Sequence, residues 1–348
     1  ITDAMLSVLD KLLMIVFCSI LIWGDISWFR LSIFNFALAQ LAAYSITFIV
    51  CLFFVYLLTE KIVLTLSWNY FTNIARETMP YAVIYFLMTT YYRIDGVMLE
   101  KLQGANGAAE SGIYAQGYRI MEALNNIGYL FAGILLPLFS YRIAQKLEIK
   151  SLLKSGFSII YCVAVAIIIG LFTYKQDIIK ILYSTTADVG YSAEVFGYLL
   201  LNFFPVALLY VVGTLLTANK NFKWMIYTLL LAVMLNISLN FYLITNFGAK
   251  GAGIATLITQ LFMLVCYSVY CIRIFNLSFS IKYFTQLFAY ASLCLMAIYF
   301  LSKQCFSTNN LYDLAIHIAC YFAFIPFITF LSGLINKQTF QLKVGVDK

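Results

Sequence analysis

The stretch MPYAVIYFLMTTYYRIDGVMLE, residues 79–100, begins as an apolar run long enough to cross a lipid bilayer and then places Arg93 and Asp95 within it. A membrane-spanning helix needs about 20 mostly apolar residues, and a charge at its centre costs roughly 2.5–3.5 kcal/mol on insertion. Counted from Met79 at about 1.5 Å per residue, Arg93 lies about 21 Å along a hydrocarbon core about 30 Å thick. The two charges therefore lie off-centre, or neighbouring helices shelter them.

The composition of the whole chain is that of a membrane protein. Of its 348 residues, 63% are hydrophobic and 11% are charged, whereas a soluble domain carries about 25% charged residues. The net charge of +7 is therefore interpreted as loop topology and not as a nucleic-acid-binding surface. Eight cysteines without a CxxC pair and a single histidine offer little for metal binding or soluble-enzyme chemistry. We predict no catalytic residue, no metal site and no bound cofactor.

Ten segments are long and apolar enough to be membrane-spanning helices. They cover residues 4–23, 37–59, 80–99, 113–139, 155–173, 195–217, 225–246, 252–272, 283–302 and 314–334. The connections after the second, fourth, sixth, eighth and tenth segments hold 13 basic residues. The connections after the first, third, fifth, seventh and ninth segments hold 6. Because cytoplasmic loops are enriched in Lys and Arg, we expect both ends of this chain in the cytoplasm. The predicted fold class is all-α, a polytopic helical membrane protein.

The charged helix and the segment after it are predicted to form a polar hairpin. The second segment carries Arg119 and Glu122 three residues apart, on one helix face. A turn centred near Asn106 would bring them to the depth of Arg93 and Asp95. Such a cluster either locks two helices together by ion pairs or lines a water-filled cavity, since intramembrane charges often mark substrate and ion paths. The candidate cavity residues are Arg93, Asp95, Arg119, Glu122, Asn125, Asn126, Tyr92 and Tyr118.

The residue types in this set point to an anionic substrate and a coupling ion. Arginine binds phosphate through a bidentate fork, so Arg93 and Arg119 suit a phosphate-bearing head. Asp95 or Glu122 could take up and release a proton or Na⁺.

Three stretches of the chain resemble a known superfamily. They are RIDGVML (93–99), GIYAQGYRIMEALNNIGYLFAGILLPLFS (112–140), and the pair TANKNF (217–222) and NISLNFYLITNFGAKGAGIATLITQ (236–260). They resemble the multidrug/oligosaccharidyl-lipid/polysaccharide (MOP) exporters, and within these the polysaccharide transporter branch, the O-antigen-type flippases. The resemblance implies a two-lobe transporter fold like that of the multidrug and toxin extrusion (MATE) proteins.

The resemblance also implies a division of the chain. The family has two six-helix lobes, often followed by two extra helices, and the ten segments here align with helices five to fourteen. The first four helices would then be missing and the N-terminal lobe incomplete. The implied parts are an N-lobe remnant (1–59), a cytoplasmic amphipathic linker between the lobes (60–79), a complete C-terminal lobe (80–275), and two extra helices with a cytoplasmic tail (276–348).

The function that the resemblance implies is transport of a lipid-linked sugar. The chain would flip undecaprenyl-pyrophosphate-linked oligosaccharides across the bacterial inner membrane by alternating access, for surface polysaccharide biosynthesis. The implied partners are this polyprenyl-pyrophosphate substrate, membrane lipids and other polysaccharide-assembly proteins. Coupling to H⁺ or Na⁺ would drive the transport.

Several alternatives stay open at this point. A cation-coupled multidrug exporter would favour a carboxylate-rich cavity, whereas each helix of the predicted hairpin carries an arginine. A lipid II flippase of the same superfamily fits the same residues. A membrane-embedded glycan polymerase or transferase would need a large polar outer loop, and the longest outer connection, 174–194, holds no catalytic cluster but includes a possible short helix at DIIKILYS (177–184). A non-transporting scaffold is the remaining alternative.

Overall fold

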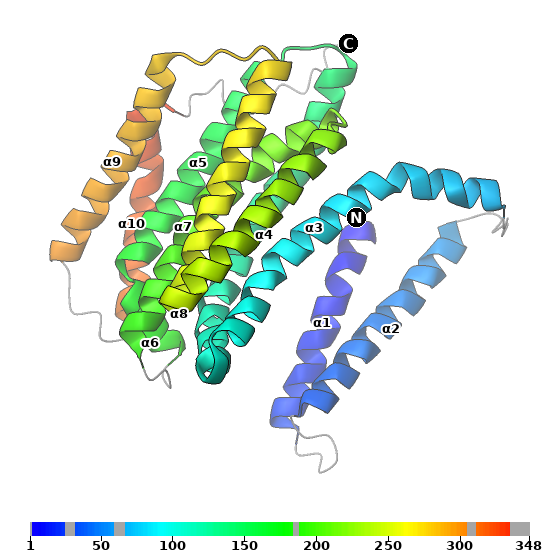
Figure 1. The fold of residues 1–348 in the computed structure, drawn as a ribbon, viewed down its shortest axis with the longest axis horizontal. Helices are drawn as coiled ribbons and strands as arrows, with labels where there is room; N and C mark the ends of the chain where they lie inside the picture. The colour runs from blue at the N-terminus through cyan, green and yellow to red at the C-terminus, as the bar shows by residue number, and fades with distance from the viewer. Residues whose placement is uncertain (1, 25–31, 59–66, 184–187, 305–310, 335–348) are drawn as a thin grey trace. The chain divides into compact units, whose positions relative to one another are not determined.

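The computed structural model describes residues 2–24, 32–58, 67–183, 188–304 and 311–334, and each regular element in these ranges is a helix (Figure 1). By its contacts the chain divides into two units, Ile1–Ile74 and Ala75–Lys348. Each unit is described by itself.

The first unit is built from two helices and the beginning of a third. Helix α1 (Thr2–Trp23) packs against α2 (Ile33–Leu58). Small side chains allow the two helices to approach closely, and Ala39 and Ala43 of α2 are buried together with Leu21 of α1.

The second unit is a helical bundle with α7 at its centre. Its helices are α3 (Trp68–Leu102, which begins in the first unit), α4 (Gly107–Ala144), α5 (Lys150–Thr173), α6 (Lys175–Leu182), α7 (Val189–Ala218), α8 (Phe222–Ile274), α9 (Ile281–Gln304) and α10 (Leu311–Ser332). Helix α7 packs against α4, α5, α6 and α8. It carries the largest share of the core, including Phe196, Leu200 and Phe203, which are fully buried.

Helix α8 is two arms joined at a reversal. Gly248 has φ 57° and ψ −135°, a conformation that no helical residue adopts and that glycine reaches without steric cost. Beyond it the chain runs back along the first arm, as two contacts between the arms show. The rings of Trp224 and Tyr270 stack at 4.6 Å, and the Tyr267 hydroxyl donates to the Met225 carbonyl at 3.5 Å. The two arms lie side by side in Figure 1.

Counting the two arms of α8 separately, each of the ten predicted spans coincides with a described helix or arm. By length and composition, seven of the described helices can cross a membrane, with α8 counted once; α3, which carries Arg93 and Asp95, is not among them. The short helix predicted in the 174–194 connection is confirmed as α6. Residues 60–66 of the predicted linker lie outside the described residues, and 68–79 form the first part of α3.

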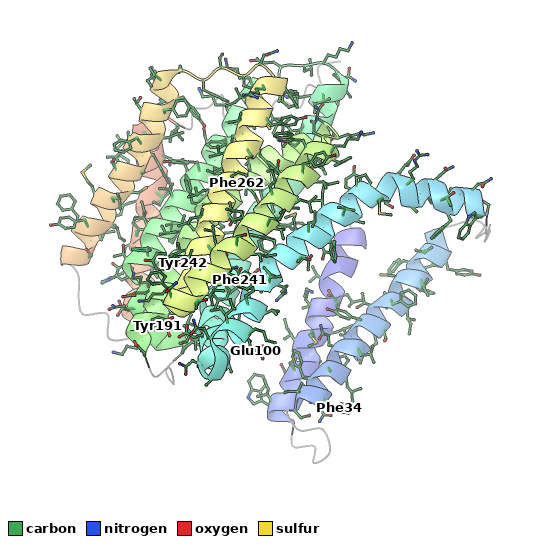
Figure 2. The ribbon with its side chains drawn as sticks, viewed as in Figure 1. Phe34, Glu100, Tyr191, Phe241, Tyr242 and Phe262 are labelled. Carbon is green, nitrogen blue, oxygen red and sulfur yellow. The ribbon has the colours of Figure 1, made fainter. Side chains whose placement is uncertain are left out.

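The surface of the bundle is apolar, as a lipid environment requires. Large side chains such as Phe241 and Tyr242 are exposed on the first arm of α8 (Figure 2). The α9–α10 pair is attached to α5 through tyrosine hydroxyls: Tyr290 donates to the Cys162 carbonyl at 2.9 Å, and Tyr161 donates to the Leu287 carbonyl at 3.1 Å. In a core without water, each of these bonds satisfies a group that is costly to leave unpaired.

Candidate functional site

The predicted hairpin between α3 and α4 is present. A short 3-10 turn, η1 (Gly104–Asn106), joins the two helices. Across it, the Ser111 hydroxyl donates to the Gly96 carbonyl at 3.0 Å, and Arg93 Nη2 lies 3.5 Å from Glu122 Oε1. These contacts pair residues before and after Asn106 in the antiparallel register expected from the sequence.

Asp95 does not join this ion pair. Its side chain is 2% exposed, whereas Arg93 and Glu122 are 71% and 52% exposed. Positions two apart on a helix point about 200° from each other, so Asp95 faces the interior of the bundle. The four charges predicted to cluster are therefore divided between two faces of α3.

Three neutral groups donate hydrogen bonds to the Asp95 carboxylate. The Tyr114 hydroxyl bonds Oδ2 at 2.8 Å, the Thr256 hydroxyl bonds Oδ2 at 2.5 Å, and Asn240 Nδ2 bonds Oδ1 at 2.7 Å. Within the described part of the chain, no basic side chain lies within ion-pair distance of this carboxylate. Hydrogen bonds to a charged acceptor are the strong ones, and here they take the place of a counter-ion.

The reversal in α8 brings two of these donors together. Asn240 lies eight residues before Gly248 and Thr256 lies eight residues after it. In two antiparallel arms that meet at Gly248, these positions share one level of the bundle, so Asn240 reaches Asp95 from the first arm and Thr256 from the second. Asn240 also donates to Asn236 Oδ1 at 3.0 Å, while its own Oδ1 is buried without a hydrogen-bond partner.

A second carboxylate holds the reversal itself. Glu110, in the first turn of α4, accepts hydrogen bonds through Oε2 from the Tyr191 hydroxyl at 2.6 Å and from the Ala249 amide at 2.7 Å. The Ala249 amide is one of the unpaired donors at the start of the second arm, where a negative group is favourable. A Cβ on Gly248 would lie 2.5 Å from Glu110 Oε2. Glu110 therefore caps the second arm and closes over a position that only glycine fits.

Sequence reasoning missed this cap. The sequence predicts a turn between the spans 225–246 and 252–272, but no local pattern links Glu110 to this turn. Lys250 also links the start of the second arm of α8 to α7. It forms an ion pair with Glu194, and its Nζ lies 4.9 Å from the ring centre of Tyr191. Figure 2 shows Tyr191 near the end of the bundle where α7 begins.

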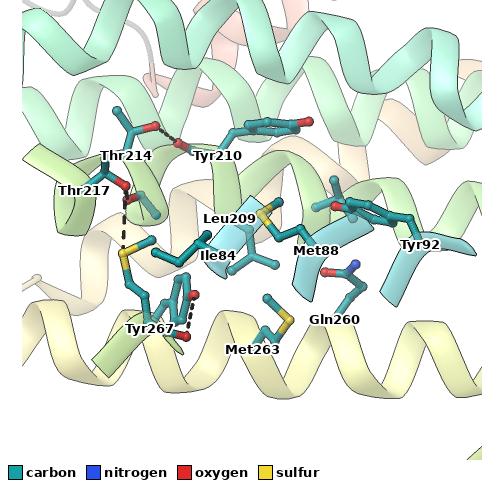
Figure 3. A pocket seen from close by; sticks show the side chains of 13 residues that line it. Ile84, Met88, Tyr92, Leu209, Tyr210, Thr214, Thr217, Gln260, Met263 and Tyr267 are labelled. Carbon is teal, nitrogen blue, oxygen red and sulfur yellow. Dashed lines mark hydrogen bonds between the residues drawn. The ribbon is translucent and has the colours of Figure 1, made fainter. Parts of the chain in front are cut away.

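A cavity of about 200 Å³ lies one helical turn from the Asp95 network. Figure 3 shows that Tyr92 and Gln260 lie at one end of it and Tyr267 and Thr217 at the other. Gln260 follows Thr256 by four residues, about 6 Å along the helix. The lining comes from α3, α7 and both arms of α8 and is mostly apolar, with a few hydroxyl and amide groups, the composition typical of a ligand pocket.

The other predicted residues are distributed along α3 and α4. Arg119 is exposed, and the amide of Asn126 donates to the Glu122 carbonyl at 3.2 Å. Asn125 is half-buried, and its Oδ1 has no hydrogen-bond partner. The ring of Tyr118 stacks on that of Tyr114 at 5.9 Å. Of the predicted set, Tyr92 lines the cavity and Asp95 lies beside it.

Comparisons with known proteins find a matching family model and similar solved structures. A family model described as "Lipid II flippase MurJ" matches residues 108–323. A structure of the lipid II flippase MurJ in an inward closed conformation matches with a TM-score of 0.66 and 14% identity, over 95% of this chain and 68% of that one. A MOP superfamily transporter from Pyrococcus furiosus matches with a TM-score of 0.48 and 19% identity, over 74% of this chain and 61% of that one. No curated protein matches the sequence.

Proposed function

Because the chain belongs to the MurJ family of lipid II flippases, whose model matches residues 108–323, we propose that it flips lipid II, or a closely similar lipid-linked precursor, across the bacterial inner membrane. The family match is the observation that carries this proposal. The all-helical fold supports it, since the described helices are apolar and long enough for a multi-pass membrane protein. The proposed topology has both ends of the chain in the cytoplasm, as the distribution of basic residues favours.

The family match confirms the resemblance to the MOP superfamily and reverses the order of the two substrates considered from the sequence. O-antigen-type oligosaccharides were expected first and lipid II was the alternative; the match favours lipid II. Both substrates are polyprenyl-linked sugars that carry phosphate, so the chemistry expected of the site is the same. A transporter of this kind performs no covalent step, which agrees with the lack of a predicted catalytic residue.

We propose that the exposed face of the α3–α4 hairpin meets the anionic head of the substrate. Arg119 is exposed, and Arg93 keeps most of its surface accessible although Glu122 lies 3.5 Å away. Guanidinium groups in a low-dielectric cavity bind phosphate strongly and with directional hydrogen bonds. Asn125, Asn126 and Tyr118 lie on the same helix as Arg119 and would offer hydrogen bonds to the sugars.

We propose that the Asp95 network is where the coupling ion, H⁺ or Na⁺, binds. A carboxylate that is buried among neutral donors is costly to keep charged, and a proton or a small cation removes that cost. Hard cations take oxygen ligands, and this position offers the Asp95 carboxylate, the Thr256 hydroxyl and the buried Oδ1 of Asn240, which has no hydrogen-bond partner. Ion binding would then change the bonds that tie α3 to both arms of α8.

The substrate is tested by complementation in two bacterial strains, one depleted of its lipid II flippase and one lacking its O-antigen flippase. We expect the protein to restore growth of the first strain and not to restore surface glycan in the second. Rescue of the second strain alone would overturn the substrate assignment. Arg119→Ala at a matched protein level should reduce the rescue, and normal rescue would remove Arg119 from the substrate path.

The coupling site is tested with purified protein in vesicles. Transport of a fluorescent lipid-linked precursor should depend on a Na⁺ or a proton gradient, and Asp95→Asn should abolish that dependence while the protein stays folded. A variant whose transport responds to the gradient as the unmodified protein does would show that the coupling ion binds elsewhere.

A further inference from the structure

A second cavity lies at the opposite end of α8's second arm from the Asp95 network. It has a volume of about 180 Å³ and lies among α5, α7, α8, α9 and the connection between α8 and α9. Ser268, on its wall, follows Thr256 by 12 residues, about 18 Å along the helix. The cavity is therefore separate from the candidate site described above. Figure 1 shows the end of the bundle where α8 ends and α9 begins.

The wall of this cavity is mostly hydrocarbon, with Ser268 and Tyr283 as its hydroxyl-bearing residues. Its lining includes Leu153, Phe157, Val212, Ile272, Leu277 and Phe284. The Tyr283 hydroxyl is already bonded to the Ser158 hydroxyl at 2.9 Å, so it offers little to a polar ligand. A sugar or a hydrated ion would leave its own polar groups unpaired there. An alkyl chain has no such groups.

The rim of the cavity is basic. Lys150 Nζ donates to the Ser278 hydroxyl at 3.3 Å, and Lys154 Nζ lies 4.9 Å from the ring centre of Tyr283. Neither lysine forms an ion pair with an acidic side chain among the described residues. Residues 142–154 and 273–282 together hold six basic residues and one acidic residue, so the local charge is strongly positive.

An apolar cavity beside two lysines that form no ion pair among the described residues matches the chemistry of an anionic phospholipid. The positive-inside rule assigns this end of the bundle to the cytoplasmic side, where the leaflet is rich in anionic lipids. Basic pockets between membrane helices on that side bind anionic lipid head groups. We propose that this cavity holds part of one acyl chain of an anionic phospholipid, and that Lys150 and Lys154 bind the phosphate of its head group.

Such a lipid would join α9 to the rest of the bundle. Its chain would contact Phe157 of α5 and Phe284 of α9, and its phosphate would lie between α5 and the α8–α9 connection. The site does not depend on the proposed flippase function, because it uses none of the residues assigned to substrate or coupling ion.

The proposal is tested by titrating the purified protein, in a neutral detergent, with dioleoyl phosphatidylglycerol and dioleoyl phosphatidylcholine, and counting bound lipids by native mass spectrometry. We expect one phosphatidylglycerol to bind more tightly than phosphatidylcholine. Lys150→Gln with Lys154→Gln should weaken phosphatidylglycerol binding about fivefold for each lysine, and Lys150→Arg with Lys154→Arg should preserve it. Ser268→Trp, which fills the cavity, should weaken binding without removing a charge.

The matched control is Lys220→Gln with Lys223→Gln, which removes one basic residue from the connection between α7 and α8 and one from the first turn of α8; neither residue lines the cavity. If the control weakens binding as much as the Lys150 and Lys154 variant does, the lipid is held by general charge and the site does not exist. Equal binding of the two lipids would also overturn the proposal. Displacement of phosphatidylglycerol by an equimolar amount of undecaprenyl phosphate would assign the cavity to the substrate's polyprenyl chain instead.

Discussion

Arg93 and Asp95 are two residues apart on α3 and lie in opposite environments. Arg93 meets Glu122 on an exposed face of the hairpin, whereas Asp95 is buried and is bonded by three neutral donors from α4 and both arms of α8. An exposed ion pair contributes little to stability, and a buried carboxylate is costly unless its hydrogen bonds are complete. Arg93, which has an ion-pair partner, is therefore expected to contribute less to stability than Asp95. Asp95 has no counter-ion among the described residues, and its carboxylate joins α3 to α4 and to both arms of α8.

Asp95→Ala should destabilise the protein more than any other substitution considered for this comparison. The substitution leaves the Tyr114 and Thr256 hydroxyls and the Asn240 amide without their common acceptor, and a buried donor left unpaired costs about 1–3 kcal/mol. We expect the free energy of unfolding in detergent to fall by about 3 kcal/mol or more. Asp95→Asn, which keeps the size and one carbonyl acceptor, should lose less. A denaturant midpoint for Asp95→Ala close to that of the unmodified protein would contradict the structural role of the network.

Gly248→Ala should be the next most damaging change. The position has φ 57°, where an L-residue is strained, and the new methyl group would meet Glu110 and Tyr191. We expect a loss of about 2 kcal/mol, measured by the same unfolding experiment. Gly96→Ala is the control, because a Cβ there meets nothing within 4 Å and alanine stabilises a helix interior. Equal midpoints for the two variants would mean that the reversal in α8 is not as described.

Glu110→Ala should cost about 1–2 kcal/mol, the usual value of a helix N-cap, because the Ala249 amide and the Tyr191 hydroxyl lose their acceptor. Tyr191→Phe alone should cost less, and the double variant should be less destabilised than the sum of the two single losses. A thermal-unfolding cycle of the four proteins measures this. Strict additivity would argue that Glu110 and Tyr191 do not act through one hydrogen bond.

Arg93→Ala and Glu122→Ala should have the smallest effect on stability. Both side chains are more than half exposed and their closest atoms are 3.5 Å apart, so the coupling energy in a double-mutant cycle should be below about 1 kcal/mol and should decrease with added salt. A large coupling that is insensitive to salt would mean that the pair is sheltered from solvent. Arg93 and Asp95 would then both contribute to stability from sheltered positions.

Much of the architecture could be predicted from local sequence. The ten mostly apolar segments appear as helices because a helix satisfies nearly all of its backbone hydrogen bonds within the segment, as lipid requires. The hairpin register was also predictable, since a short turn near Asn106 leaves one antiparallel alignment of Arg93 and Glu122. The cap at Glu110 was not, because its partners Tyr191 and Ala249 are 81 and 139 residues further along the chain.

The sequence by itself determined that this is a multi-pass helical membrane protein and that Arg93 and Asp95 lie two residues apart on α3. Only the tertiary structure decided what each charge does. Asn240 and Thr256 are 145 and 161 residues from Asp95, and they meet it because Gly248 reverses α8 midway between them. Helix formation in a bilayer is a local requirement of the backbone, readable in a window of about 20 residues. The pairing of a buried carboxylate depends on which helices pack together, and no local window contains that information.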